Sequence, residues 1–116
     1  MKQTEYHIQV AVVNWIRSQY PKTLLTISPS GMKLRPTVAF KIKCMGYLAG
    51  TPDLLILEPR GEYHGLFVEL KAEKGKLTTF QKEFLTALSA RGYYACVAYG
   101  FKEAVKLISN YLNKGA

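Results

Sequence analysis

Thr51-Pro52-Asp53-Leu54-Leu55-Ile56 and Leu66-Phe67-Val68-Glu69-Leu70-Lys71 are the two stretches that decide the fold of this chain. Each joins an apolar run to a carboxylate, and Pro59-Arg60-Gly61 supplies turn residues between them. Two apolar runs separated by a turn predict a β-hairpin. Fifteen residues separate Asp53 from Glu69, and we expect the paired strands to bring these acids side by side.

The other elements follow from the same kind of pattern. Apolar residues recur at helical spacing over residues 4–20, and Pro21 ends that helix. We further expect a strand at 24–28, a basic loop at 28–35, a helix at 36–45, strands at 54–57 and 66–70, a helix at 79–91, a strand at 93–99 and a last helix after Gly100. The order αβαββαβα predicts an α/β fold, a central mixed β-sheet with helices on both faces. The two strands that flank the crossover helix should lie parallel.

Composition points to a single domain, 1–116, with a polyanionic partner. Sixteen basic residues against eight acidic ones give a net charge of +8 and a pI of about 9.6. Such a charge favours nucleic acid, although it could also serve solubility alone. Cys44 and Cys96 lie in no metal-binding pattern and are predicted to be core residues of a reducing compartment. No run is long enough for a membrane span, so we expect the cytoplasm of a bacterial or phage-infected cell and no membrane partner.

The hairpin acids predict a metal site. Side chains alternate along a strand, so Glu69 and Lys71 share one face while Leu70 points into the core. Two close carboxylates repel each other, and Mg²⁺ or Mn²⁺ would relieve that repulsion, with Asp53, Glu69 and the backbone carbonyl of Leu70 as ligands. A metal beside Lys71 suits hydrolysis of a phosphodiester, leaving a 3′-hydroxyl and a 5′-phosphate.

Each of these residues also has an ordinary structural explanation. Pro52-Asp53 is also an ordinary turn dipeptide, and Glu69 with Lys71 could form a salt bridge on an exposed strand. Glu5 could merely favour the helix dipole. Gln81 completes a Thr78-Thr79-Phe80-Gln81 capping box, and its functional alternative is to project over the metal site. His7 and His64 are expected at the surface or behind the site rather than as ligands. The remaining acids are predicted to be solvated charges: Glu58, Glu62, Glu73, Glu83 and Glu103.

Basic residues flank the predicted site in sequence. One group precedes the hairpin, with Lys33, Arg35, Lys41 and Lys43, and another follows it, with Lys74, Lys76 and Lys82. Contacts of this kind position a phosphate backbone without reading its sequence. Individually, most of these side chains could simply be solvated.

Taken together, the motifs resemble the VRR-NUC branch of the PD-(D/E)xK nucleases. The resemblance rests on Glu5 with Gln9, Gly50-Thr51-Pro52-Asp53-Leu54, Tyr63-His64-Gly65-Leu66-Phe67-Val68-Glu69-Leu70-Lys71, Gly75-Lys76-Leu77-Thr78 with Gln81, and then Gly92-Tyr93, Gly100 and Ala104. It covers essentially the whole chain. Where the family tends to have Ile-Pro-Asn-Gly after the first strand, this chain has Ile27-Ser28-Pro29-Ser30-Gly31, which leaves its DNA preference open.

The resemblance implies a restriction-endonuclease-like core and a Mg²⁺- or Mn²⁺-dependent endonuclease. Asp53 and Glu69 would be the metal ligands, Lys71 the catalytic lysine, and Glu5 and Gln81 supporting residues. It also implies a homodimer that acts on branched DNA in the manner of Holliday junction resolvases, because a two-fold enzyme matches a four-way junction.

Three other functions compete with this one. The same nuclease could act on flaps, nicks or plain duplex. A phosphatase would use similar ligands, but the basic charge argues against a small substrate. A basic module that binds nucleic acid without cutting is the most distant alternative, and the intact set Asp53, Glu69 and Lys71 argues against it.

Overall fold

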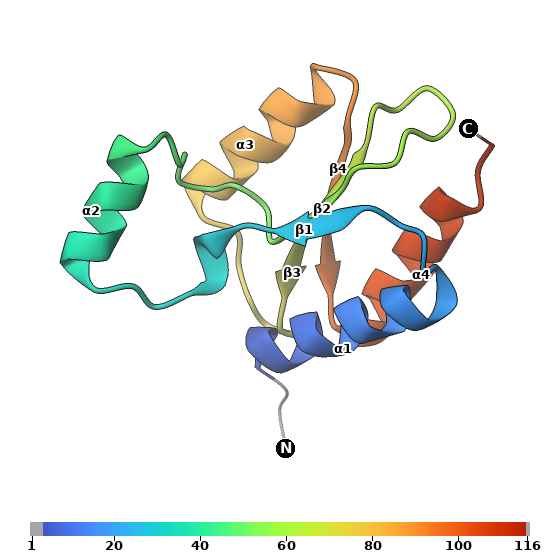
Figure 1. Ribbon diagram of the computed structural model, residues 1–116, viewed down its shortest axis with the longest axis horizontal. Helices are drawn as coiled ribbons and strands as arrows, with labels where there is room; N and C mark the ends of the chain where they lie inside the picture. The colour runs from blue at the N-terminus through green and yellow to red at the C-terminus, as the bar shows by residue number, and fades with distance from the viewer. Residues whose placement is uncertain (1–3, 116) are drawn as a thin grey trace.

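A four-stranded mixed sheet forms the centre of the computed structural model, which describes residues 4–115 (Figure 1). The elements, in chain order, are α1 (Glu5–Gln19), β1 (Leu25–Ile27), a 3₁₀ turn (Pro29–Gly31), α2 (Pro36–Cys44), β2 (Leu54–Ile56), β3 (Leu66–Lys71), α3 (Thr79–Ser89), β4 (Tyr94–Tyr99) and α4 (Phe101–Leu112). The predicted order αβαββαβα is therefore confirmed. The predicted loop at 28–35 differs in that its start is wound into the 3₁₀ turn, with Ser28 accepting a hydrogen bond from the Ser30 amide.

The strands lie in the order β1-β2-β3-β4. β2 and β3 form the predicted antiparallel hairpin, with Leu54 opposite Val68. β3 and β4 are parallel, with α3 as the crossover between them, also as predicted. The hairpin register leaves Asp53 and Glu69 as the next pair beyond Leu54 and Val68, because both strands continue in that direction.

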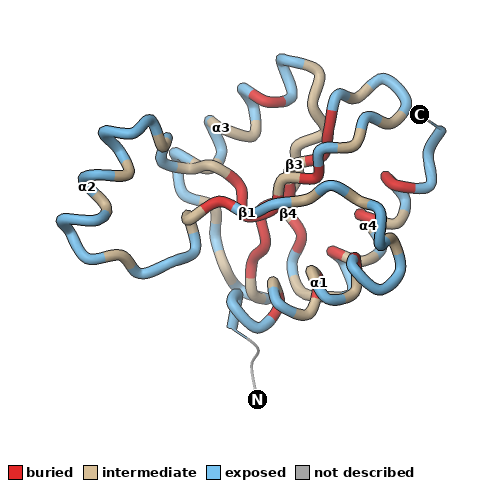
Figure 2. The backbone as a smooth tube through the Cα atoms, viewed as in Figure 1, coloured by how far each residue is buried: buried red, intermediate tan, exposed pale blue. Residues whose placement is uncertain are grey.

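Helices cover both faces of the sheet. α1 and α4 pack together on one face, and α3 packs against β4 on the other (Figure 1). The main core lies on the α1 and α4 side, where Figure 2 shows the buried stretches of these elements together. It is built from the apolar stripes of both helices and alternate residues of the strands: Ile8, Val12, Ile16, Leu54, Ile56, Leu66, Val68, Leu70, Ala98, Ala104, Ile108, Tyr111 and Leu112.

Alternation along β3 decides where the site residues go. Leu66, Val68 and Leu70 belong to that core. Glu69 and Lys71 consequently point to the opposite face, toward α3. This arrangement confirms the prediction that Leu70 is a core side chain while the two charged residues share a face.

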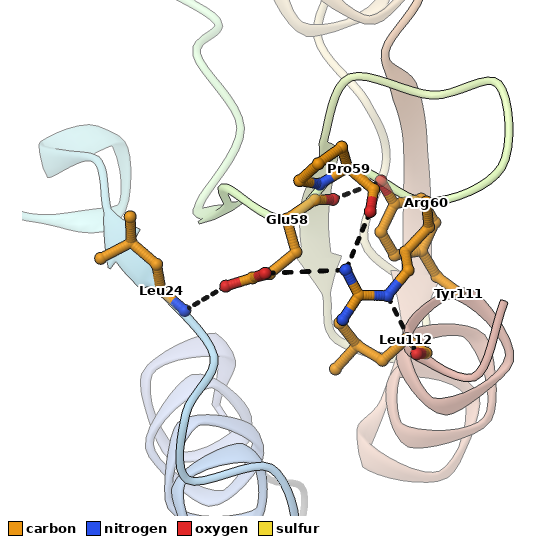
Figure 3. Close-up of polar contacts among 6 residues, drawn as sticks. All are labelled: Leu24, Glu58, Pro59, Arg60, Tyr111 and Leu112. Atoms are coloured by element: carbon orange, nitrogen blue, oxygen red, sulfur yellow. Dashed lines mark hydrogen bonds and ion pairs between the residues drawn. The ribbon is translucent and has the colours of Figure 1, made fainter. Parts of the chain in front are cut away.

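A polar network ties the far end of the sheet to α4 (Figure 3). Glu58 accepts a hydrogen bond from the Leu24 amide at 2.8 Å and forms an ion pair with Arg60 at 3.6 Å. Arg60 in turn donates to the carbonyl of Leu112, and the Tyr111 hydroxyl donates to the carbonyl of Glu58 at 2.7 Å. The prediction that Glu58 is simply a solvated charge is wrong, because this carboxylate holds the start of β1 against the β2 end.

α2 stands apart from the layers (Figure 1). None of its residues is buried, and it projects from the long connection between β1 and β2. Several large apolar side chains of α2 and the segments beside it are exposed: Met32, Val38, Phe40, Met45 and Leu48. Cys44 is exposed for the same reason, which corrects its prediction as a core residue, whereas Cys96 packs against the core.

Candidate metal centre and active site

Asp53 lies at the edge where β2 begins, and its carboxylate bridges two parts of the chain. One oxygen, Oδ2, accepts a hydrogen bond from the Leu70 amide of β3 at 2.8 Å. The other, Oδ1, accepts from the Ser30 hydroxyl at 3.1 Å. Because the side chain is only 6% exposed, these bonds fix its orientation toward the end of β3.

Glu69 is the most unusual group in the structure. The residue is only 2% exposed. Burial and the nearby charge of Asp53 raise the pKa of Glu69 to about 9, against an ordinary 4.5. Its Oε1 atom is buried without any hydrogen-bond partner among residues 4–115. A buried carboxylate oxygen without a donor is costly, so the site is incomplete as a purely protein structure.

Gln81 serves the helix and the site at the same time. Its Oε1 accepts the Thr78 amide at 2.9 Å, and Thr78 Oγ1 accepts the Gln81 amide at 3.1 Å, which completes the predicted capping box. The capping bond requires the amide oxygen on that side, so the NH₂ group must face the other way. Its Nε2 donates to Glu69 Oε2 at 3.2 Å. The predicted capping box is therefore confirmed, and the same side chain also contacts Glu69.

Gly50 brings the loop before Asp53 against the start of α3. This glycine has φ of +91°, and a Cβ at its position would lie 2.4 Å from the carbonyl oxygen of Phe80. Only a residue without a side chain allows this approach. The close contact holds the start of α3, and with it Gln81, beside the segment that leads to Asp53.

Lys71 and Glu5 lie at the carboxyl end of β3. Lys71 is only 7% exposed, so the alternative of a salt bridge on an exposed strand is wrong. The ion pair between Glu58 and Arg60 is the one found in residues 4–115, and Lys71 is therefore not paired with Glu69. Glu5 Oε2 accepts the Ala72 amide at 3.3 Å. This contact secures the turn after β3 and brings a further negative charge toward Glu69, whose pKa it helps to raise.

The donor set fits a divalent cation. Asp53 and Glu69 are close enough that the charge of Asp53 contributes to the raised pKa of Glu69. A cation would satisfy the unpaired Glu69 Oε1 and neutralise both acids. In the described part of the chain, no three His, Cys, Asp or Glu side chains are grouped to hold a metal. A cation here would thus need oxygen ligands beyond the two acids, such as the Leu70 carbonyl and water.

Two further residues contact this site that the sequence patterns did not single out. Ser30 binds Asp53, as described above. The phenol of Tyr47, which follows α2, has a pKa raised chiefly by burial and also by the charges of Glu69 and Asp53, while hydrogen bonding with Ser30 and Thr51 opposes the shift. Neither residue lies in a recognisable motif, since both reach the site through the folding of the connection between β1 and β2. The one available signal was Ser30-Gly31 in the loop where the chain departs from the family pattern.

The basic residues predicted to bind nucleic acid lie at the surface. Lys33, Arg35, Lys41, Lys74 and Lys76 are all exposed and none forms an ion pair within residues 4–115.

Two glycines bring their segments close to the acids. A Cβ at Gly31 would lie 3.6 Å from Asp53 Oδ1, and one at Gly75 would lie 3.2 Å from both Glu5 Oε2 and Lys71 Cδ.

A sheet of this topology, with two acids and a lysine converging beside its central hairpin, defines a nuclease-like α/β fold. The VRR-NUC domain model matches residues 3–102 of the chain. Among solved structures, one described as a VRR_NUC domain protein is 36% identical, with a TM-score of 0.86 over 99% of this chain and 93% of that one. A second, described as a VRR_NUC domain, is 27% identical, with a TM-score of 0.57 over 94% of this chain and 99% of that one. No curated protein matches the sequence.

The chain belongs to the VRR-NUC family. It is a nuclease-type domain, and a nuclease domain implies binding to nucleic acid. Within residues 4–115, no helix is both long enough and apolar enough to cross a membrane.

Proposed function

We propose that the chain is a single nuclease domain, 1–116, that hydrolyses phosphodiester bonds in branched DNA with Mg²⁺ or Mn²⁺, acting as a homodimer. The observation that carries this proposal is the buried, unpartnered Glu69 Oε1 beside the Asp53 carboxylate. A structural ion pair or capping role for these acids would leave no oxygen unsatisfied.

Each residue of the site has a defined role in this proposal. Asp53, Glu69 and the Leu70 carbonyl would hold the cation, which would supply charge to polarise the scissile phosphate and to lower the pKa of a bound water. Lys71 lies two residues after Glu69 on the same face and stabilises negative charge at the phosphate. Gln81 holds the Glu69 carboxylate in place through its NH₂ group. Glu5 holds the turn after β3.

The surface of α2 supports a homodimer. Phe40 on α2 is 67% exposed and Met45, directly after α2, is 85% exposed, and large exposed apolar side chains can mark an interface. On α4, by contrast, the apolar residues Ala104, Ile108, Tyr111 and Leu112 are part of the core. Phe40→Gln should shift the mass in solution from dimer to monomer. Leu24→Gln should leave the mass unchanged, because Leu24 is a similarly exposed apolar residue, directly before β1 and away from α2.

Cleavage of a synthetic four-way junction tests the function. The wild type and Asp53→Ala are compared with Mn²⁺ on the junction and on its linear duplex arms. Selective, Asp53-dependent cutting of the junction is the expected result. Equal cutting of both DNAs would contradict the preference for branches and retain the nuclease. Tight binding without cutting of either DNA would favour the non-catalytic binding module.

A further inference from the structure

A groove runs from the site along α1, on the side of the free edge of the sheet. It has a volume of about 450 Å³ and lies between α1 and β1, and β1 is an edge strand because it pairs with β2 alone in the sheet. Asp53 and Glu5 line the groove together with residues far from the metal site. Whatever enters the groove is therefore continuous with a phosphate held at Asp53.

The length of the groove follows from the helix that forms its wall. The α1 residues that line it come from successive turns, from Glu5 and Tyr6 to Arg17. At the rise of an α-helix this distance is roughly 18 Å. The volume lies within the range of small-ligand sites, which suits a nucleotide of a single strand rather than a duplex.

The lining offers both flat apolar surfaces and unused polar groups. Tyr6 of α1 is 72% exposed, and Met32, which follows the 3₁₀ turn, is 61% exposed. Gln9 and Asn14 add amide groups, and Arg17 adds a positive charge at the far end. Arg17 forms no ion pair within residues 4–115. An aromatic face, amides and a guanidinium are the groups that bind a base face, a base edge and a phosphate.

We propose that this groove between α1 and β1 receives an unpaired nucleotide next to the scissile phosphate. Its base stacks on Tyr6, Gln9 and Asn14 contact the base edge, and Arg17 binds a phosphate further along the unpaired strand. The inference rests on the proposed nuclease function, and it explains in physical terms how the site would distinguish branched DNA from duplex. A base paired within a duplex cannot leave its stack without losing pairing and stacking energy.

The test measures binding separately from cutting. The probe is a duplex with a short single-stranded branch that carries 2-aminopurine beside the branch point, in Ca²⁺ to limit cleavage. Stacking on Tyr6 should quench its fluorescence. Tyr6→Ala should abolish the quenching and reduce the preference for the branched probe over plain duplex on the order of ten-fold. Tyr6→Phe, which keeps an aromatic face, should retain both effects.

Arg17 has a matched control in Arg91, an exposed arginine at the end of α3, away from the groove. Arg17→Gln should weaken binding of the branched probe, and Arg91→Gln should not. Loss of affinity for branched and duplex DNA by the same factor in Tyr6→Ala would overturn the proposal, as would unchanged quenching.

Cutting assays keep this inference separate from the proposed function. Branch cleavage that is lost in Asp53→Ala but unaffected in Tyr6→Ala and Arg17→Gln would overturn nucleotide binding in the groove. The proposed nuclease activity would stand. If the wild type cuts no DNA but shows Tyr6-dependent quenching, nucleotide binding in the groove is supported and the proposed nuclease activity is overturned.

Discussion

At the scale of residues, burial of Glu69 is the feature with the largest consequences. In the metal-free protein its pKa lies near 9 rather than 4.5. Between these values the folded chain holds a proton that the unfolded chain has lost. The folded state therefore binds more protons, and the free energy of unfolding falls as the pH rises from about 4.5 to about 9.

Glu69→Gln removes this dependence. In EDTA at pH 8 we expect the variant to be more stable than the wild type, by on the order of a few kcal/mol at most. At pH 4.5 or below the two proteins should be similar. Thermal unfolding at several pH values checks this result, with the exposed Glu73→Gln as the matched control. An equal pH dependence in the wild type and Glu69→Gln would contradict the raised pKa.

The double role of Gln81 can be separated by mutation. Thr78→Ala removes one half of the capping box but leaves the Thr78 amide and its bond to Gln81. Gln81→Ala removes the other half and also the contact with Glu69. Both variants should lose about 1 kcal/mol of stability, measured by denaturant unfolding. Only Gln81→Ala should also lower the cleavage rate, by roughly ten-fold or more, and equal rates in the two variants would exclude a role in the site.

At the scale of elements, the chain shows where sequence patterns suffice. The convergence of Asp53, Glu69 and Lys71 was predictable, because local apolar runs encode the hairpin and side chains alternate along β3. The capping box at Thr78 was equally local. The position of Tyr47 and the exposure of α2 were not predictable, because they depend on how a long connection folds back over the site. Glu58 was misjudged for the same reason, since its partners Leu24 and Tyr111 are distant in sequence.

Gly50 links two elements, and its substitution should affect both. Gly50→Ala combines an unfavourable positive φ with a clash against the Phe80 carbonyl of α3. Gly46→Ala is the matched control, since Gly46 has φ of +115° but no atom within 4 Å of the added Cβ. We expect Gly46→Ala to cost about 1 kcal/mol and Gly50→Ala about 2 kcal/mol more, by chemical denaturation. Similar losses of stability in Gly46→Ala and Gly50→Ala would show that α3 shifts to relieve the clash at little cost.

At the scale of the whole molecule, the net charge of +8 should govern DNA affinity. Each phosphate neutralised by a basic side chain contributes roughly −0.9 to the slope of log K against log salt concentration for duplex DNA. Lys33→Gln and Lys76→Gln should each reduce the slope by about one, measured by fluorescence anisotropy with Asp53→Ala as the background. Lys22→Gln serves as the control, because Lys22 is an exposed residue of the loop that joins α1 to β1 and does not line the groove. A slope that no substitution changes would remove these residues from the DNA surface.

The proposed nuclease activity requires that Asp53 and Glu69 hold a divalent cation. Calorimetric titration of Mn²⁺ into the protein near pH 7, in two buffers of different ionisation enthalpy, tests it directly. We expect one site per chain and the release of about one proton, because the cation must displace the proton of Glu69. Glu69→Gln should lose the site, and Glu73→Gln should keep it. Absence of binding in the wild type, or equal binding in Glu69→Gln, would contradict the account.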